Sequence, residues 1–384
     1  MEQSTKGVEH HVSDYVIKVV SRCNFRCTYC YIYELADRSY ISQPFVMDEQ
    51  TVRLCAQRIR EHQKEDAGGP VRIVLHGGEP LLFGKERIEK LVAVFDEVLG
   101  PQNYLLGVQT NGILLDSRWI DLLAKLRIAV GVSLDGPAAY HDARRVDSNG
   151  FGTHDRVEKA IRLLLSSSAG RRIFSGVLAV VNPACPPEEL YAYMRGLGIE
   201  QWDILLPDHN HRYPPDRTHG TGYGEWLVRL FCCWLEEDNP ARVVGFFEDA
   251  MAVMLGKSIA HTFWGLNPLG VAVIETDGSL EIPEYFKACA EGITKTGLHV
   301  ERDPVAALLD NRLWRLSLDR AGSLCAACRR CEWASVCGGG LLSHRYSEDK
   351  SFDNVSVYCE DLKYFLSFVR QRLDLHYAFH DPFA

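Results

Sequence analysis

Short apolar runs alternate with longer amphipathic stretches from residue 14 to about residue 207. The apolar runs predict six strands, at residues 15–20, 71–75, 104–109, 129–133, 174–181 and 202–206. The stretches between them have helical periodicity and predict helices at residues 48–64, 86–99, 117–126, 153–165 and 187–197. Because each connection is long enough to hold a helix, we expect the strands to pair in parallel. The pattern predicts an α/β fold built as a partial (β/α)6 TIM-like barrel, with a doubly wound sheet as the open alternative.

The pattern changes beyond residue 207. Residues 223–237 and 243–255 predict helices with aromatic faces, and such faces usually belong to a core. A hairpin is expected at residues 271–282, with Asp277 and Gly278 in its turn, and a last amphipathic helix at residues 361–373. We therefore predict three parts: the partial barrel at 14–207, a helical linker segment at 208–269 and a C-terminal unit at 270–375.

Composition narrows the class of protein. The chain has 384 residues, a formal charge of -9 and 13 cysteines. The negative charge argues against nucleic-acid binding, and no run approaches the roughly 18 apolar residues of a membrane span. The first residues are polar and do not resemble a signal peptide. Thiols in an unexported chain are typical of metal or redox chemistry, so we expect a cytoplasmic metalloprotein without membrane or nucleic-acid partners.

Two groups of cysteines carry the candidate metal chemistry. Cys23, Cys27 and Cys30 directly follow the first predicted strand. Three thiolates can hold three irons of a four-iron cluster and leave the fourth open to a small chelating cofactor, although a structural zinc site is an alternative. The second group lies near the C-terminus and comprises Cys325, Cys328, Cys331, Cys337 and Cys359. Its spacing alone fits either an iron–sulfur cluster or an all-thiolate zinc site.

Short polar segments follow the next predicted strands, at the edge where such a fold places ligands. Gly77, Gly78 and Glu79 follow the second strand, and the paired glycines allow the backbone to approach a ligand closely. The other polar positions are Gln109, Asn111, Ser133, Asp135 and Arg144. Each segment is also an ordinary turn, so their occurrence after successive strands is the informative feature.

These motifs together resemble the radical S-adenosylmethionine (SAM) enzymes of the SPASM group. The resemblance implies a partial (β/α)6 barrel with a C-terminal SPASM-type iron–sulfur domain. It implies a [4Fe-4S] cluster on Cys23, Cys27 and Cys30, with SAM chelating the open iron. By position, Glu79 would hold the amino group of SAM, Arg144 its carboxylate and Ser133 its ribose or methionyl part. The remaining implied SAM contacts are Tyr29, Gly77, Gly78, Gln109, Asn111 and Asp135.

The C-terminal cysteines depart from the usual SPASM pattern. Cys328, Cys331, Cys337 and Cys359 match the ligands of one auxiliary [4Fe-4S] cluster. Leu341 stands where the SPASM pattern has a further cysteine. The pattern also has an upstream pair of cysteines for a second auxiliary cluster, and the hairpin where that pair begins has Glu281 and Pro283 and no cysteine. Only Cys289 lies near that region, so we expect a single auxiliary cluster, and Cys325 has no assigned role. The reduced set resembles peptide maturases of the FxsB type, which form three-residue cyclophanes.

The resemblance implies a reaction and its partners. A one-electron donor such as a flavodoxin or ferredoxin would start SAM cleavage, and hydrogen would be abstracted from the Cβ of a residue in a ribosomally made precursor peptide. The carbon would then bond to an aromatic ring, with Asp277, Glu281 or Glu284 as general base. Formylglycine or thioether formation is the alternative within the enzymes. A zinc-stabilised peptide-binding module is the alternative outside them.

Overall fold

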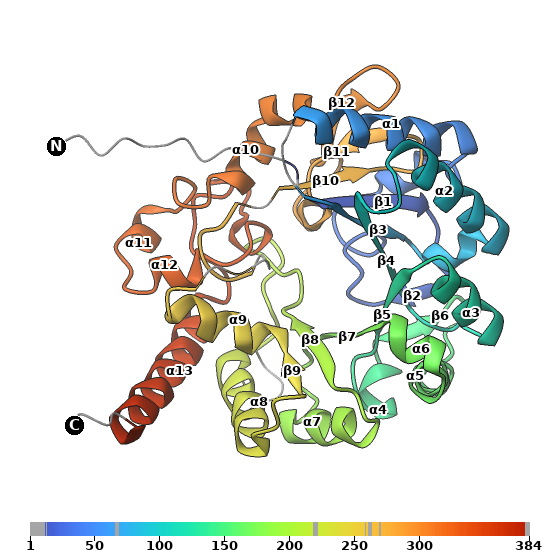
Figure 1. Cartoon of the computed structure of the whole chain (residues 1–384). Coiled ribbons are helices and arrows are strands. Elements are labelled where there is room, and N and C mark those ends of the chain that lie inside the picture. Colours follow the sequence, from blue (N-terminus) through green and yellow to red (C-terminus); the bar gives the residue numbers. More distant parts are fainter. Residues whose placement is uncertain are drawn as a thin grey trace.

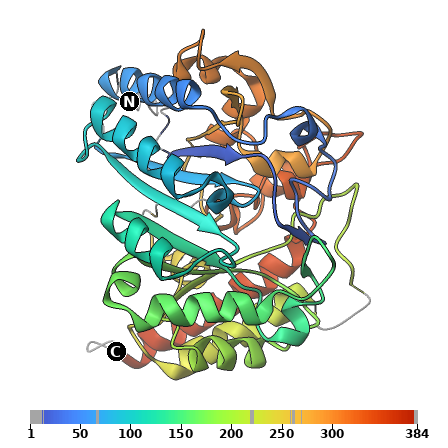
Figure 2. The same ribbon diagram turned by 90° about the vertical axis from the view of Figure 1, so that its right-hand side faces the viewer.

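The computed structural model describes residues 12, 14–65, 69–217, 222–257, 259, 263–268 and 270–380. Its centre is a ten-stranded sheet in the order β12-β11-β10-β1-β3-β4-β5-β7-β8-β9. Six strands pair in parallel, as predicted: β1 (Asp14–Val20), β3 (Val71–Gly77), β4 (Tyr104–Thr110), β5 (Ile128–Ser133), β7 (Phe174–Val180) and β8 (Gln201–Leu205). The sheet is curved, with helices along its outer side (Figures 1 and 2). The α/β fold with a partial barrel is therefore confirmed.

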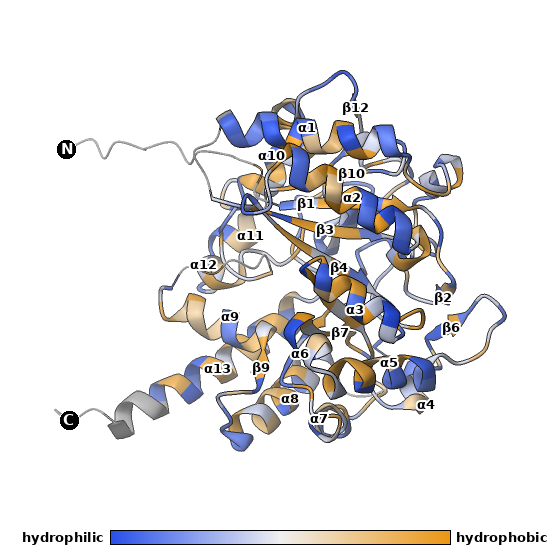
Figure 3. Ribbon diagram, turned by 45° about the vertical axis from the view of Figure 1, so that its right-hand side comes forward, coloured by the Kyte–Doolittle hydropathy of each residue, from blue (hydrophilic) through white to orange (hydrophobic). Residues whose placement is uncertain are grey.

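The helices that link these strands follow the amphipathic pattern of the sequence. They are α1 (Glu49–Glu65), α2 (Lys85–Val98), α3 (Ser117–Lys125), α5 (His154–Ser166) and α7 (Pro187–Gly196). The carboxylate of Asp116 caps α3 by accepting from the backbone N–H of Trp119, and Trp119 and Leu123 on that helix are buried. Figure 3 shows hydrophobic residues along the strands and hydrophilic residues on the outer turns of these helices. Burial of the apolar faces against the sheet is the main stabilising contribution.

The C-terminal hairpin continues the sheet of the barrel. β10 (Val271–Ile274) pairs in parallel with β1, and β11 (Ser279–Glu281) and β12 (Lys295–His299) follow it in antiparallel order. The hairpin turn at Asp277 and Gly278 lies where the sequence predicts it. The sheet therefore crosses the boundary expected near residue 270, and the division of the chain into three parts stays a prediction.

One predicted helix begins differently. The helix expected at residues 243–255 starts with a short strand, β9 (Val243–Val244), which pairs with β8, and the helix itself is α9 (Gly245–Met254). β-branched valines favour an extended conformation, and a free edge of β8 is available to pair with them.

The remaining long helices pack their aromatic faces together. α8 (Tyr223–Glu237), α9 and α13 (Cys359–His380) meet at a cluster in which Phe231, Phe247 and Phe365 have ring centroids 5.3–5.9 Å apart. Trp264 stacks on Phe365 within the same cluster. The aromatic stripes are thus core, as expected. Within the described ranges, no helix is both long enough and apolar enough to cross a membrane.

Three further helices are α4 (Ala138–His141), α6 (Ser168–Ile173) and α10 (Arg312–Leu318), and two short ones carry cysteines, α11 (Ala326–Arg329) and α12 (Ala334–Cys337). A two-stranded ribbon completes the fold, β2 (Phe25–Cys27) with β6 (Arg145–Asp147). Figure 1 shows α11, α12 and α13 on the opposite side of the molecule from α1, α2 and α3.

Candidate active site

The loop after β1 carries the first three thiols into a cavity at the carboxyl edge of the sheet. Cys23, Cys27 and Cys30 line this cavity, which has a volume of about 200 Å³ and is partly open to solvent. Cys27 lies in β2, opposite Arg145 of β6, and the N–H of Thr28 donates to the carbonyl of Arg144 at 2.9 Å. The ribbon β2–β6 therefore ties the cysteine loop to the segment after α4. Sequence analysis missed this ribbon because three-residue strands have no periodicity to detect.

The two glycines after β3 are required by the close approach of the cysteine loop. A Cβ on Gly77 would lie 1.9 Å from the carbonyl oxygen of Val20, and one on Gly78 would lie 2.1 Å from that of Arg22. This proximity lets the N–H of Gly78 donate to Val20 at 3.0 Å and that of Glu79 donate to Arg22 at 3.1 Å. Both glycines line the cavity, so the backbone of β3 forms its wall as the sequence predicts.

Glu79 lies beneath this wall and does not line the cavity. Its carboxylate is fully buried and accepts from the hydroxyl of Thr110 at 2.6 Å, the N–H of Asn111 at 2.8 Å and the N–H of Leu81 at 3.0 Å. Burial raises the pKa of Glu79, and the three hydrogen bonds oppose that effect. The carboxylate thus joins the end of β3 to the end of β4.

Polar side chains at the carboxyl ends of β4 and β5 face the cavity and form hydrogen bonds. The Nε2 of Gln109 donates to the hydroxyl of Ser133 at 3.0 Å. The Nδ2 of Asn111 donates to Oδ1 of Asn24, within the cysteine loop, at 2.7 Å. Gln109, Asn111 and Ser133 line the same cavity as the three thiols. The structure therefore brings these predicted residues together.

Tyr29, Asp135 and Arg145 form a buried group at one side of the cavity. The hydroxyl of Tyr29 donates to Asp135 at 2.6 Å and accepts from Arg145 at 2.6 Å. Arg145 and Asp135 are also an ion pair, with N and O atoms 3.8 Å apart. Burial raises the pKa of Tyr29 well above its usual value, so this hydroxyl stays protonated.

The neighbouring residue Arg144, which sequence analysis proposed as a SAM contact, has a different place. Its guanidinium lies 4.3 Å from the centre of the Tyr29 ring and donates to the carbonyl of Val181 at 3.1 Å. Arg144 lines an adjoining cavity, whereas Arg145 lines the one with the thiols. Arg144 directly precedes β6 and Arg145 begins it, and the side chains of consecutive residues in an extended chain point to opposite faces. The sequence alone does not tell which face meets the ligand.

The three candidate bases on or after the hairpin have separate surroundings. Asp277 is exposed in the turn and accepts from Gln43 at 3.1 Å. Glu281 is buried, accepts from Thr294 at 2.7 Å and pairs with Lys287 at 3.1 Å. Neither lines the thiol cavity.

Only Glu284 among the three contacts side chains of the cavity. It accepts from the hydroxyl of Tyr31 at 2.6 Å, lies 3.2 Å from Nδ1 of His76 and pairs with Lys18 at 2.9 Å. Burial opposes ionisation, but His76 and Lys18 outweigh it and lower the pKa of Glu284 to about 2. Lys18 also pairs with Glu275 at 3.4 Å, and Glu275 pairs with Lys287 at 2.7 Å. This buried charge network, Lys18–Glu275–Glu281–Glu284–Lys287, joins β1 to the hairpin.

Several cavity residues were not predicted. They are Tyr31, Tyr33, His76, Thr110, Arg145 and Asp208. His76, at the end of β3, and Asp208, just beyond β8, follow the same positional rule that selected the other residues, so that rule could have found them. Asp208 and Tyr29 line both the thiol cavity and the adjoining one, which has a volume of about 480 Å³.

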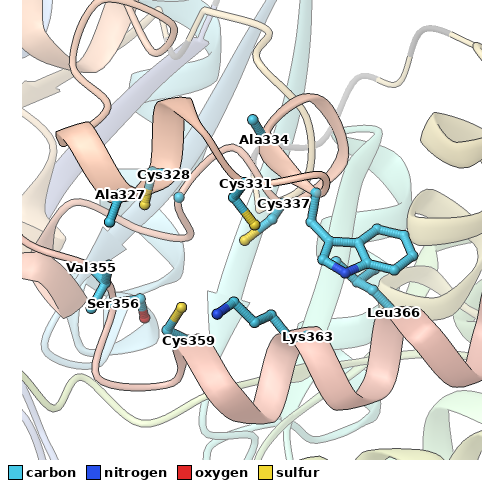
Figure 4. Close-up of a pocket in the computed structure, with 12 residues that line it drawn as sticks. Ala327, Cys328, Cys331, Ala334, Cys337, Val355, Ser356, Cys359, Lys363 and Leu366 are labelled. Carbon is cyan, nitrogen blue, oxygen red and sulfur yellow. The ribbon is translucent and has the colours of Figure 1, made fainter.

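The second group of thiols surrounds another cavity, formed by α11, α12 and the start of α13 (Figure 4). Cys328, Cys331, Cys337 and Cys359 line it, and the ammonium group of Lys363 points into it. Burial raises the pKa of Cys337 to about 11, so this thiol is neutral until a metal displaces its proton. Cys325 is buried beside Cys328 and does not line the cavity, and Cys289 is buried in the main core.

Both thiol sites are suited to soft metal centres. Each has three or four thiols on one cavity wall, and thiolate is the ligand that iron–sulfur clusters use. Among the residues that the structure describes, no three His, Cys, Asp or Glu side chains converge as a group that could hold a single metal ion. The donors line the cavity walls instead, around space for a larger group.

Comparisons with known proteins agree with this geometry. Residues 17–181 match the family described as the Radical SAM superfamily. A cysteine-type anaerobic sulfatase-maturating enzyme of Clostridium perfringens is 26% identical over 375 residues, covering 92% of this chain and 95% of its own. A serine-type enzyme of Bacteroides thetaiotaomicron is 22% identical over 345 residues, covering 85% and 81%.

Solved structures extend the likeness over most of the fold. Native anSMEcpe with bound AdoMet superposes with a TM-score of 0.81 at 25% identity, covering 94% of this chain and 98% of its own. Streptococcus suis SuiB has a TM-score of 0.62 at 15% identity, covering 90% and 76%, and shows the fold alone. The family binds a [4Fe-4S] cluster and SAM, and the thiol cavity with its glycine wall suits both. Residues 17–181 thus match the Radical SAM superfamily, and the protein is a radical SAM enzyme.

Proposed function

We propose that the protein is a maturase that oxidises a side chain within a peptide or protein. The observation that carries this proposal is the pair of adjoining cavities that share Tyr29 and Asp208. One has the thiols for a cluster, and the other has room for a substrate side chain next to it. The relatives support the same class, since they are named sulfatase-maturating enzymes and anSMEcpe also has a structure with AdoMet and a peptide.

Cys23, Cys27 and Cys30 would hold the [4Fe-4S] cluster, which supplies the electron that cleaves SAM. The backbone of Gly77 and Gly78, which lines the cavity, would bind SAM beside it together with Gln109, Asn111 and Ser133. Arg145, rather than Arg144, carries its guanidinium on the thiol cavity, where Tyr29 and Asp135 orient it. We propose Arg145 for the carboxylate of SAM, because its buried Nε has no hydrogen-bond partner among the residues that the structure describes and can donate to an anion.

Glu79 supports this site from behind. Its two oxygens already accept three hydrogen bonds, so we propose that it fixes Asn111 and the end of β3 instead of binding the amino group of SAM directly. Cys328, Cys331, Cys337 and Cys359 would hold one auxiliary [4Fe-4S] cluster. An external one-electron donor such as a flavodoxin or ferredoxin completes the set of partners.

Oxidation of a Cys or Ser side chain to formylglycine is the reaction that the relatives favour. Formation of a cyclophane is the second candidate, because the hairpin has Glu281 and Pro283 where SPASM enzymes place cysteines. Both reactions begin with loss of hydrogen from Cβ. They diverge when the carbon either forms a double bond to its own oxygen or sulfur or bonds to an aromatic ring.

Product analysis tests the proposal. Reduced, reconstituted protein is incubated with SAM and peptides that carry Cys or Ser near an aromatic residue. We expect 5′-deoxyadenosine and a modified peptide. Reaction of that peptide with a hydrazide shows an aldehyde and supports formylglycine, whereas loss of two hydrogens with resistance to hydrazide supports the crosslink. Unmodified peptides together with 5′-deoxyadenosine that carries no hydrogen from them would contradict the proposal.

A further inference from the structure

Asp208 stands at the junction of the two cavities. It follows β8 after Leu206 and Pro207, at the carboxyl edge of the sheet. Its side chain lines the thiol cavity with Cys30 and Tyr31, and the adjoining cavity with Arg144 and His209. A group in this place contacts whatever lies between a cofactor bound at the thiols and a substrate in the second cavity.

The carboxylate of Asp208 also differs from the other acids nearby. Glu79 accepts three hydrogen bonds, Asp135 accepts from Tyr29 and from the N–H of Val180, and Glu284 is engaged by Tyr31, His76 and Lys18. No hydrogen bond or ion pair joins Asp208 to any other side chain in the ranges that the structure describes. Its oxygens are therefore available to a substrate without prior loss of an internal contact.

Asp208 and Glu284, whose charges interact, differ widely in proton affinity. Burial, with a further contribution from the Glu284 carboxylate, raises the pKa of Asp208 to about 7. The pKa of Glu284 is about 2, because His76 and Lys18 stabilise its charge against the effect of burial. Two carboxyl groups separated in this way typically divide acid–base work between them, and the one titrating near neutral pH accepts protons efficiently.

We propose that Asp208 is the catalytic base that takes a proton from the substrate as its side chain is oxidised. The inference rests on the proposed function. After a hydrogen atom has left Cβ, the carbon radical must lose one electron and one proton. The proton of an O–H, S–H or ring C–H bond is transferred to Asp208. The electrons of that bond form a carbon–oxygen or carbon–sulfur double bond, or restore the aromatic ring. The remaining electron would pass to an oxidised iron–sulfur cluster. Glu284 then acts as a fixed negative charge that positions Tyr31 and His76.

The surroundings of Asp208 set its pH dependence. Its charged and titratable neighbours come from six parts of the fold: its own segment after β8, α8, the cysteine loop, the segment after α4, the segment after β11 and the C-terminal region. They are Tyr31, Arg144, His209, Asp216, Tyr223, Glu284, Cys289 and Tyr358. Glu284 stays ionised and Tyr31 stays protonated at neutral pH, so a transition near pH 7 is expected from Asp208.

The test separates hydrogen abstraction from proton transfer. The substrates are peptides with Cys or Ser deuterated at Cβ. They are given to the wild-type enzyme and to the variants Asp208→Asn, Asp208→Glu and Glu284→Gln. The control is Asp155→Asn, because the side chain of Asp155 is 99% exposed. Deuterium in 5′-deoxyadenosine reports abstraction, and mass spectrometry reports product. We expect Asp208→Asn to retain deuterium transfer within about twofold while product falls by about 100-fold. We expect Asp208→Glu to recover part of the product.

The pH profile completes the test. Product formation by the wild type should rise with one ionisation near pH 7, and that ionisation should be absent in Asp208→Asn and present in Glu284→Gln. Retained product in Asp208→Asn, or equal loss of deuterium transfer and product in both Asp208 variants, would overturn the assignment. If the wild type transfers no deuterium from either peptide, the proposed function itself fails. Circular dichroism and iron content verify that the variants are folded and loaded.

Discussion

Replacement of Gly78 by Ala would place a methyl group in a close contact between the residue after β3 and the cysteine loop. Its Cβ would lie 2.1 Å and 2.2 Å from the carbonyl oxygen and carbon of Arg22, and 2.3 Å from the hydroxyl of Tyr33. The first two atoms belong to the backbone, so the loop must retreat by about 1 Å to reach an ordinary contact distance. We expect a loss of about 1–3 kcal/mol in the free energy of unfolding, as for other overpacked sites.

The functional effect should exceed the loss of stability. The displaced loop carries Cys23, and a misplacement of about 1 Å in a reacting group can lower a rate roughly 100-fold. Reconstituted Gly78→Ala protein is therefore expected to lose iron at the first thiol site and to form 5′-deoxyadenosine about 100-fold more slowly. Iron analysis, electron paramagnetic resonance and chromatography of the nucleoside products measure these effects.

The matched control is Gly196→Ala at the end of α7. A Cβ there meets no atom within 4 Å, so stability and SAM cleavage should stay at the wild-type values. Normal stability, iron content and cleavage rate in Gly78→Ala would refute the reasoning. Such a result would mean that the loop can move away without consequence for the site.

Three other substitutions probe the two thiol sites and the core. Cys27→Ala should abolish 5′-deoxyadenosine formation. Cys359→Ala should reduce the amount of peptide product more than the rate of SAM cleavage. Equal losses of both in Cys359→Ala would indicate a folding role for this thiol. The buried guanidinium of Arg345 donates to the backbone carbonyls of residues 323, 352 and 354. Arg345→Met should therefore lower the free energy of unfolding by about 3 kcal/mol and release iron from the second site. A denaturant melt checks this against the control Arg370→Met, which changes a half-exposed arginine. Burial lowers the pKa of His344 to about 3, so the folded protein favours the neutral imidazole. As pH falls below about 6.5, the free energy of unfolding should decrease by up to roughly 1.4 kcal/mol per pH unit. His344→Phe should show a smaller decrease in stability between pH 7 and pH 5 than the wild type, and an unchanged difference in urea melts would count against the assignment.

Most of the barrel could be predicted because its strands and helices have strong, distinct periodicities. The six parallel strands lie within two residues of the predicted bounds, and the polar segments after them meet at one edge. Parallel strands all end at the same edge of the sheet, so their order alone predicts that Gly78, Asn111 and Ser133 lie near the first three thiols. The same reasoning located the aromatic core of α8, α9 and α13.

Orientation at the ends of the strands could not be predicted in the same way. Glu79 turns beneath the wall because its position lets three donors converge on it, and Arg145 replaces Arg144 at the cavity because of the β2–β6 pairing. Both results depend on contacts between segments that are distant in sequence. Asp208 was passed over for a different reason: a single Asp after a strand resembles a solvated turn residue until the two cavities beside it are known.

The hairpin shows how the C-terminal region contributes to the radical site. β10 pairs directly with β1, the strand that leads into the cysteine loop, and Lys18 of β1 is held by Glu275 and Glu284 of the C-terminal region. A buried lysine with two carboxylates keeps its charge, because the carboxylates raise its pKa against the effect of burial. Loss of either carboxylate would remove one of the two anionic partners of Lys18. The hairpin is therefore a structural support of the thiol cavity, and changes in it should alter SAM cleavage as well as peptide modification.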